Sequence, residues 1–198
     1  MSRQVGILLF DDVEVLDFAG PFEVFSVAGR NAGRGEPSFV VSTVASRPGP
    51  VVARNGLTVV PHFTVANSPA FDIVVVPGGY GSRALLADET VLDWVRRRDA
   101  DAELTLSVCT GALVLGAAGL LNGLEATTHH GALDELRRWA PAAKVLPDAR
   151  IVDNGRVILS GGISAGIDMS LHVVARLLGM EQARETARYM EYDWRPEG

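Results

Sequence analysis

Continuous apolar runs alternate with amphipathic segments along most of this chain of 198 residues. A run without polar positions predicts a strand buried on both faces, as in a parallel sheet, because a half-buried strand alternates apolar and polar residues. The long runs predict strands over residues 5–10, 39–44, 71–76 and 104–108, and weaker patterns predict short strands within 51–60 and at 125–128, 150–153 and 156–159. The turn Asn154–Gly155 marks the last two as a hairpin.

Segments with helical spacing of apolar residues separate these strands. They predict helices over residues 21–29, 83–86, 89–99, 110–120, 131–139, 165–178 and 181–192, with a polar loop at 31–37. Pro21 favours a helix start, since proline is tolerated at the first helical position. Strands that alternate with helices predict an α/β fold with a doubly wound, mostly parallel sheet sandwiched by helices. No shift in composition divides the chain, so we expect one domain over 1–198.

The lone cysteine of the chain stands directly between a predicted strand and a predicted helix. The apolar run 104–108 ends at Cys109, and a helix of small residues follows from Thr110. A strand that enters a helix through one residue bends sharply there, and this residue lies at the carboxyl edge of the sheet. This arrangement is a nucleophile elbow, and the N-terminus of the following helix favours a thiolate. We therefore expect Cys109 to be ionised near neutral pH and reactive.

Three strand ends are expected to meet beside this cysteine. In doubly wound sheets, ligands bind beyond the carboxyl ends of the strands. Those ends are residues 11–17, residues 77–81, and Cys109 with Thr110. The sequence therefore predicts one site built from three loops.

Asp17 is the candidate acid in the first of these loops. By itself it is typical of a surface loop or a helix cap. Its neighbours at positions 13, 15, 16 and 18 are apolar, which indicates a packed segment. A buried carboxyl has a raised pKa and can exchange a proton with a thiol.

Gly78 and Gly79 follow the third long strand, and two interpretations of them remain open. They are ordinary turn glycines, or their backbone N–H groups face the thiol and stabilise negative charge on a bound intermediate. Their spacing alone does not separate the two, because a Gly-Gly turn is a weak signal.

Composition narrows the class of protein. The formal net charge of −6 argues against nucleic acid as a partner, since phosphate binding needs a basic face. A single cysteine excludes an internal disulfide and suits a reducing compartment. We find no signal peptide and no apolar run near the ~20 residues that span a bilayer, so we expect a cytoplasmic protein with no membrane partner. His62 and His172 lie outside any motif, and no metal-ligand spacing occurs, so we expect no metal.

Four stretches in order resemble the ThiJ/PfpI superfamily, whose members share a flavodoxin-like, class I glutamine-amidotransferase-like fold with a cysteine elbow. They are residues 10–25, Val76–Gly79, Ser107–Gly111 and Ala126–His129. A fifth stretch, Gly161–Asp168, resembles a narrower branch that contains bacterial isocyanide hydratases and the ligand domains of AraC-type transcription regulators. The resemblance covers essentially the whole chain.

The resemblance implies a role for each matching position. Cys109 takes the place of the nucleophile, and Asp17 takes that of its acidic partner, where the wider family more often has glutamate. Gly78 and Gly79 match the anion-stabilising loop. Thr110 matches a threonine that contributes to the site in the hydratases. Proteases and amidases of the superfamily have a histidine at this position, so the threonine argues against a Cys-His dyad.

His129 and Asp168 are the remaining polar candidates. The family places a histidine at the position of His129 without making it an obligatory base, and a histidine bonded to the backbone is the commoner arrangement. We therefore expect His129 to line the site. Asp168 falls in the first turns of the helix over 165–178, where a carboxylate stabilises the helix dipole, and we assign it a structural role.

The resemblance implies a cofactor-free enzyme that uses Cys109 to add water to a small isocyanide, with an N-substituted formamide as product. The alternative is a small-molecule or redox sensor without turnover, because an exposed low-pKa thiol is oxidised reversibly. A third interpretation, amidase, protease or glyoxalase-like activity, is weakened by Thr110. The expected partners are a small-molecule substrate and a second copy of the chain, since Phe22 and Phe25 supply apolar positions on the first helix for a symmetric interface.

Overall fold

The computed structural model describes residues 2–29 and 37–196 of the chain, so most of the loop expected at 31–37 lies outside the described residues. Within them, a seven-stranded sheet has the order β10-β11-β7-β6-β1-β2-β5. Its strands are Arg3–Leu9 (β1), Phe39–Ala45 (β2), Phe63–Thr64 (β5), Ile73–Val76 (β6), Leu104–Val108 (β7), Ile151–Asp153 (β10) and Val157–Ser160 (β11). All pairs are parallel except the hairpin of β10 and β11.

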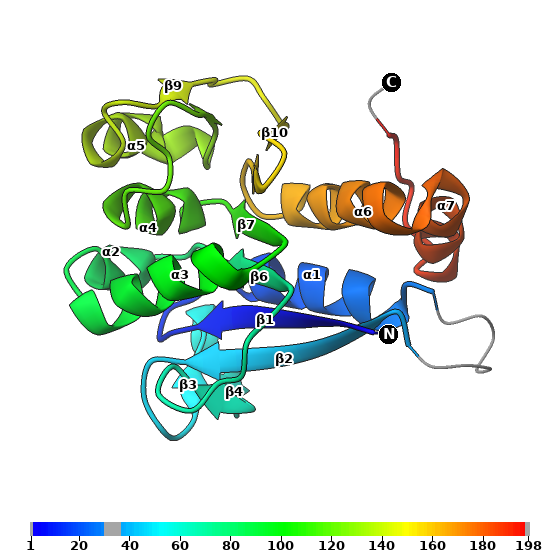
Figure 1. Ribbon diagram of the computed structural model, residues 1–198, viewed down its shortest axis with the longest axis horizontal. Coiled ribbons are helices and arrows are strands. Elements are labelled where there is room, and N and C mark those ends of the chain that lie inside the picture. Colours follow the sequence, from blue (N-terminus) through cyan, green and yellow to red (C-terminus); the bar gives the residue numbers. More distant parts are fainter. Residues whose placement is uncertain (1, 30–36, 197–198) are drawn as a thin grey trace.

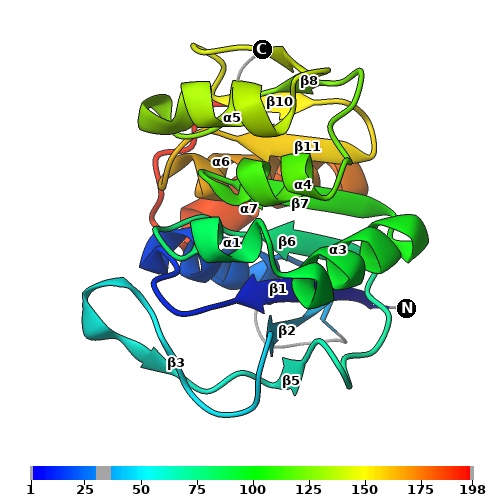
Figure 2. The ribbon, with the colours of Figure 1, turned by 90° about the vertical axis from the view of Figure 1, so that its left-hand side faces the viewer.

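Helices cover both faces of this sheet (Figure 1 and Figure 2). One face carries three helices that pack together, Val15–Val27 (α1), Ala165–Leu178 (α6) and Met180–Tyr189 (α7). The other carries Ser82–Leu85 (α2), Glu89–Asp101 (α3) and Gly111–Ala117 (α4), with Leu133–Trp139 (α5) packed on α4. This arrangement confirms the predicted doubly wound α/β sandwich. No helix in the described part of the chain is long and apolar enough to cross a membrane.

Two small sheets lie outside the main one. An antiparallel pair, Val51–Val52 (β3) and Thr58–Val59 (β4), encloses the short 3-10 turn Arg54–Gly56 and confirms the strands predicted within 51–60. The other pair is parallel and joins Glu125–Ala126 (β8) to Lys144–Val145 (β9). The strand predicted over 125–128 is therefore half as long as expected. The sequence did not predict β5 and β9, because a strand of two residues has no detectable periodicity.

The core is built from strands that are apolar along their whole length. Every residue of β6 and β7 is buried, as expected for central strands covered by helices on both faces. Phe25 of α1 is fully buried and packs on Phe39, with ring centroids 5.2 Å apart, and Phe22 packs against the same core. Phe25 therefore stabilises the interior of one chain and is not available for the expected dimer interface, whereas Phe22 is only half-buried and the dimer itself stays a prediction.

The first helix begins earlier than predicted. It starts at Val15, so Pro21 lies inside it and Asp17 belongs to its first turn. The reason is tertiary: the Glu14 amide donates to the Gly78 carbonyl at 2.9 Å, and the Gly78 amide donates to Asp17 Oδ2 at 3.0 Å. Contacts with the loop after β6 thus form the first turn of α1 before the proline is reached.

The strand order places a topological switch point beside β1. β2 lies on one side of β1 and β6 lies on the other side, so the chain leaves β1 in one direction and later returns to its opposite side. Connections that leave β1 and β6 in opposite directions make a topological switch point, where ligands bind in such folds. β7 lies next to β6, so the residue after β7 reaches the same edge of the sheet.

Candidate active site

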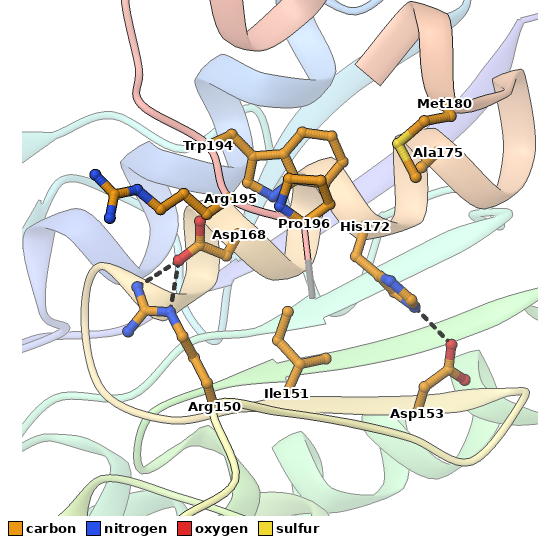
Figure 3. Close-up of a pocket in the computed structure, with 10 residues that line it drawn as sticks. All are labelled: Arg150, Ile151, Asp153, Asp168, His172, Ala175, Met180, Trp194, Arg195 and Pro196. Atoms are coloured by element: carbon orange, nitrogen blue, oxygen red, sulfur yellow. Dashed lines mark hydrogen bonds and ion pairs between the residues drawn. The ribbon is translucent and has the colours of Figure 1, made fainter. Parts of the chain in front are cut away.

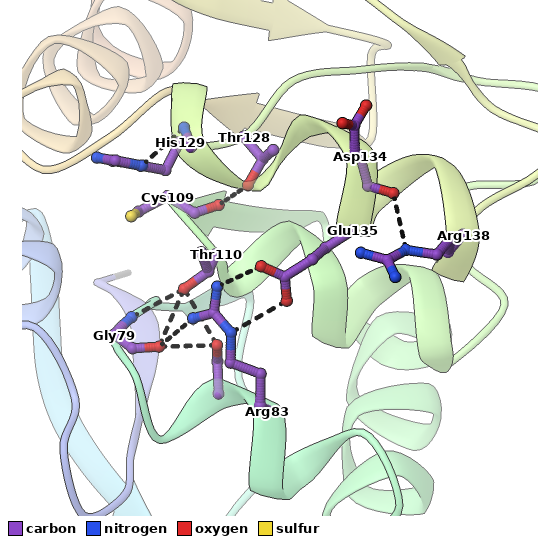
Figure 4. A network of polar contacts seen from close by, with 11 residues as sticks. Gly79, Arg83, Cys109, Thr110, Thr128, His129, Asp134, Glu135 and Arg138 are labelled. Carbon is purple, nitrogen blue, oxygen red and sulfur yellow. Dashed lines mark hydrogen bonds and ion pairs between the residues drawn. The ribbon is translucent and has the colours of Figure 1, made fainter.

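Cys109 lies at a strained elbow, as predicted. It follows β7, precedes α4, and has a φ of 56°, which costs a non-glycine residue about 1–2 kcal/mol. Three hydrogen bonds hold this conformation. The Cys109 amide donates to the carbonyls of Ser160 (3.2 Å) and Gly161 (3.1 Å), and the Thr128 hydroxyl donates to the Cys109 carbonyl at 2.8 Å (Figure 4). The surrounding structure therefore maintains the strain.

Asp17 is fully buried next to this thiol, as its apolar neighbours predicted. Oδ2 accepts the Gly78 amide, whereas Oδ1 is buried without a hydrogen-bond partner among the described residues. Burial raises the pKa of Asp17 to about 7, against the lowering effects of the Gly78 amide and the Cys109 side chain. The carboxyl can therefore both release and accept a proton near neutral pH.

The thiol itself does not ionise as we predicted. Burial, and then the charge of Asp17, raise the pKa of Cys109 to about 12, although the backbone amides of Thr110 and Ile163 act in the opposite direction. The expectation of a thiolate near neutral pH is therefore wrong for the resting site. The short helix α4 does not offset the loss of solvation of a side chain that is only 6% exposed.

Gly78 and Gly79 lie against the site, but their amides already have partners. The Gly78 amide binds Asp17, and the Gly79 amide donates to Thr110 Oγ1 at 2.9 Å. Both amides therefore orient side chains of the site. They are not the open pair of N–H groups that we expected beside the thiol. Gly79 has a φ of 124°, and a Cβ at Gly78 would overlap the Thr110 backbone, so only glycine fits this close approach.

A compact polar network surrounds Thr110. Its hydroxyl accepts the Gly79 amide and lies 3.1 Å from both the Gly79 carbonyl and the Ser82 hydroxyl (Figure 4). Ser82 Oγ in turn donates to the Gly79 carbonyl at 2.8 Å. Thr110 therefore joins the cysteine elbow to the loop after β6.

An ion pair lies at the mouth of the site. Arg83 Nε and Nη2 donate to the two carboxylate oxygens of Glu135, at 3.1 and 2.7 Å. Its third nitrogen, Nη1, donates to the Gly79 carbonyl at 3.2 Å. Arg83 thus connects α5 to the Gly79 loop.

These residues enclose a cavity of about 430 Å³ that reaches the thiol. Its lining residues are Glu14, Gly79, Tyr80, Arg83, Cys109, Thr110, His129, Gly131, Ala132, Glu135 and Ile163. His129 Nδ1 accepts the Gly131 amide at 3.1 Å, and burial is the main cause that lowers the pKa of His129. His129 therefore lines the cavity and is bonded to the backbone, as we expected.

Asp168 and His172 line a second cavity of about 250 Å³, beside α6 and the C-terminal segment (Figure 3). Arg150 Nε donates to Asp168 Oδ2 at 2.7 Å, and the Tyr192 hydroxyl donates to Asp168 Oδ1 at 3.1 Å. His172 pairs with Asp153 at 2.7 Å. Asp168 thus fastens α6 to neighbouring segments, which agrees with the structural role we expected. No cluster of three or more possible metal ligands occurs among the described residues.

Sequence reasoning did not find several residues that build the site. They are Ser82, Arg83, Thr128, Glu135 and Ile163. The position of Arg83, soon after the Gly78–Gly81 turn, could have pointed to the site. Glu135 carried no such signal, because it lies on a helix whose place over the cavity depends on the packing of α5 on α4.

The chain matches known proteins over almost its full length. Residues 3–176 match the DJ-1/PfpI family. A structure described as a ThiJ/PfpI family protein from Pseudomonas syringae is 31% identical and superposes with a TM-score of 0.87, covering all of this chain and 78% of that one. The chain therefore belongs to the DJ-1/PfpI family, as the sequence motifs predicted.

Two similar proteins have different described functions. The isonitrile hydratase of Pseudomonas putida is 39% identical over 193 residues, which cover 97% of this chain and 79% of that protein. The HTH-type transcriptional regulator GbdR of Pseudomonas aeruginosa is 28% identical over 191 residues. That match covers 96% of this chain but only about half, 51%, of the length of the regulator.

Proposed function

We propose that this protein is a cysteine-dependent hydratase that adds water to an isocyanide (isonitrile) and releases an N-substituted formamide. The observation that carries the proposal is the buried Asp17 carboxyl, with a pKa of about 7, hydrogen-bonded to the elbow thiol of Cys109, which itself lines the small cavity. Hydration of an isocyanide needs a nucleophile and a group that transfers protons in both directions, and this pair supplies both. The similarity to isonitrile hydratase supports the same activity.

The first step joins the sulfur to the terminal carbon of the isocyanide. As the S–C bond forms, the thiol proton passes to the Asp17 carboxylate and then to the same carbon, which becomes a thioimidate, S–CH=N–R. No proton is lost to solvent in this step. A thiol with a raised pKa is therefore no obstacle, because it is deprotonated only as it attacks.

The second step adds water and releases the product. Water attacks the thioimidate carbon. Asp17 takes one proton from the attacking water and passes it to the thioimidate nitrogen. The tetrahedral intermediate then expels the sulfur, and the hydroxyl proton returns to Cys109 through Asp17. The products are R–NH–CHO and the original thiol, so atoms and charge balance with one water consumed.

Thr110 and the loop after β6 position these groups. Thr110 Oγ1 borders the cavity beside Cys109 and is held by the Gly79 amide. The hydroxyl proton is directed to the Gly79 carbonyl, so Thr110 fixes the loop after β6 beside the thiol. Positioning of this kind lowers the entropic cost of the two-step reaction.

Incubation with cyclohexyl isocyanide tests the proposal. We expect N-cyclohexylformamide to form with the native protein and not with Cys109→Ala, measured by NMR of the reaction mixture. Asp134→Asn is the matched surface control and should remain active, because that side chain is 89% exposed on α5. Equal formamide production by Cys109→Ala would overturn the proposal.

Intact-mass measurement separates the hydratase from the sensor. A hydratase releases the adduct, so the native protein should return to its original mass once the isocyanide is consumed. A protein that reacts once and keeps the added mass, with no formamide, would instead be a sensor of reactive small molecules.

A further inference from the structure

Every nitrogen of the Arg83 guanidinium is engaged within the protein. Two nitrogens bind both oxygens of Glu135, and the third binds the Gly79 carbonyl. Such a paired, two-point contact fixes the guanidinium and cancels its charge locally. Arg83 and Glu135 both line the cavity that contains Cys109.

The rest of the cavity mouth is also balanced in charge. Glu14, the other acid in the lining, faces Arg54 of the β3–β4 turn at 3.7 Å. The centroid of the Tyr80 ring lies 4.1 Å from the Arg54 guanidinium carbon and 5.6 Å from that of Arg83. Within the described part of the chain, each of the two acids that line the cavity therefore lies beside an arginine, Glu135 beside Arg83 and Glu14 beside Arg54.

Arg83 lies close to the reacting group. Its Nη1 binds the Gly79 carbonyl, which is also within 3.1 Å of Thr110 Oγ1, and Thr110 directly follows Cys109 (Figure 4). A substituent attached to a carbon that bonds with Cys109 must occupy the same 430 Å³ cavity as the guanidinium. Among the described residues, two acids line this cavity, Glu14 and Glu135. Glu14 is paired with Arg54, so Glu135 is the lining acid that neutralises Arg83.

We propose that Glu135 sets the charge specificity of the site: by neutralising Arg83 at the cavity mouth, it makes the site select small uncharged electrophiles and discriminate against those that carry a carboxylate. This inference rests on the proposed function only in taking Cys109 as the reacting group. Removing the charge of Glu135 leaves the positive charge of Arg83 available, and the site then accepts carboxylate-bearing substrates.

Alkylation of Cys109 tests this without any hydratase activity. Iodoacetamide and iodoacetate transfer nearly the same group to sulfur and differ by one negative charge. The ratio of their rate constants is independent of the fraction of thiolate, because both reagents react with the same sulfur. We would measure this ratio by mass spectrometry for the native protein, Glu135→Gln and Glu89→Gln. Glu89 is a matched control, since it pairs with Arg96 on α3 and lies outside the cavity lining.

The expected result is a shift toward iodoacetate in Glu135→Gln alone. One unpaired charge near the reagent should raise the iodoacetate-to-iodoacetamide ratio by about 3- to 30-fold at low salt, and added salt should reduce the gain. The double variant Arg83→Gln/Glu135→Gln should return the ratio to near the native value, which identifies Arg83 as the charge involved. An unchanged ratio in Glu135→Gln, or an equal shift in Glu89→Gln, would overturn the proposal.

The same comparison with isocyanides distinguishes the two proposals. Glu135→Gln should raise the relative kcat/KM for the isocyanoacetate anion over cyclohexyl isocyanide. If the alkylation ratio shifts but neither isocyanide is hydrated, the charge selection stands and the hydratase proposal fails. If both isocyanides are hydrated but Glu135→Gln changes neither the alkylation ratio nor the relative kcat/KM of the two isocyanides, the hydratase proposal stands and the role of Glu135 is wrong.

Discussion

The Asp17 carboxyl and the Cys109 thiol share a buried corner, with residue exposures of 0% and 6%. Burial is the main cause that raises the pKa of each, to about 7 for Asp17 and about 12 for Cys109. Between these values the pair holds a single negative charge. In the proposed mechanism the proton moves within this pair as the sulfur attacks a substrate, so the mechanism needs no thiolate in the resting state.

This relationship predicts an acidic limb in the pH profile. Asp17 must be ionised to accept the thiol proton, so kcat/KM for isocyanide hydration should rise with pH and level off above about 7. Below that value, the rate should fall about tenfold per pH unit, as for a single essential base. Initial rates between pH 5 and pH 9 would check this. A profile that is flat across neutral pH would contradict the role of Asp17.

Asp17→Asn should separate hydration from simple thiol reactivity. Loss of the proton-transfer group should lower the hydration rate by about 100- to 10,000-fold. Alkylation by iodoacetamide should be no slower than in the native protein, because the Asp17 charge that raises the pKa of Cys109 is gone. Unchanged hydration in this variant would be incompatible with the mechanism, and Asp134→Asn controls for the substitution itself.

The same variant should be more stable than the native protein at alkaline pH. The pKa of Asp17 is raised from 3.8 to about 7 on folding, so its contribution to stability is present below pH 3.8 and is lost as the pH rises through about 7. At 1.36 kcal/mol per pKa unit, the loss reaches at most about 4 kcal/mol. Asn does not titrate, so the advantage of Asp17→Asn in urea unfolding should grow between pH 5 and pH 8. A constant difference between the two proteins would show that Asp17 does not titrate in this range.

Thr110 should be sensitive to loss of its hydroxyl. In Thr110→Val the Gly79 amide loses its acceptor, and a buried unsatisfied N–H costs about 1–3 kcal/mol. Thr110→Ser keeps the acceptor and should retain most of the stability and activity. The native protein and Thr110→Ser should therefore both be more stable in denaturant unfolding, and faster in isocyanide hydration, than Thr110→Val. Equal stability and activity of the Ser and Val variants would show that the Thr110 hydroxyl contributes to neither.

Self-association remains a prediction, now with a different surface. The β3–β4 hairpin carries Val52 and Leu57, each 48% exposed, and Tyr80 at the cavity mouth is 65% exposed. We expect a homodimer that covers these side chains, with a light-scattering mass about twice the 21.1 kDa of one chain. Leu57→Asp should shift the mass toward one chain, whereas Tyr189→Asp, an exposed position on α7, should not. A native mass near 21.1 kDa would refute the dimer.

The sequence alone determined the architecture and the position of the cysteine elbow. Apolar runs such as 71–76 and 104–108, which are short and bounded by turn signals, are typical of central strands covered by helices on both faces. The cysteine between such a strand and a helix could therefore be placed at an elbow on the carboxyl edge. Local patterns sufficed because strand burial and the elbow depend on adjacent residues.

The tertiary structure decided the chemistry of that position. Whether Cys109 is ionised depends on its burial and on Asp17, a residue that reaches it only because β1 and β7 end at the same edge of the sheet. Likewise, the Gly78 and Gly79 amides bind side chains from α1 and the cysteine elbow, and Arg83 meets Glu135 across the cavity mouth. Desolvation and long-range hydrogen bonding arise from residues distant in sequence, so they could be read only from the folded chain.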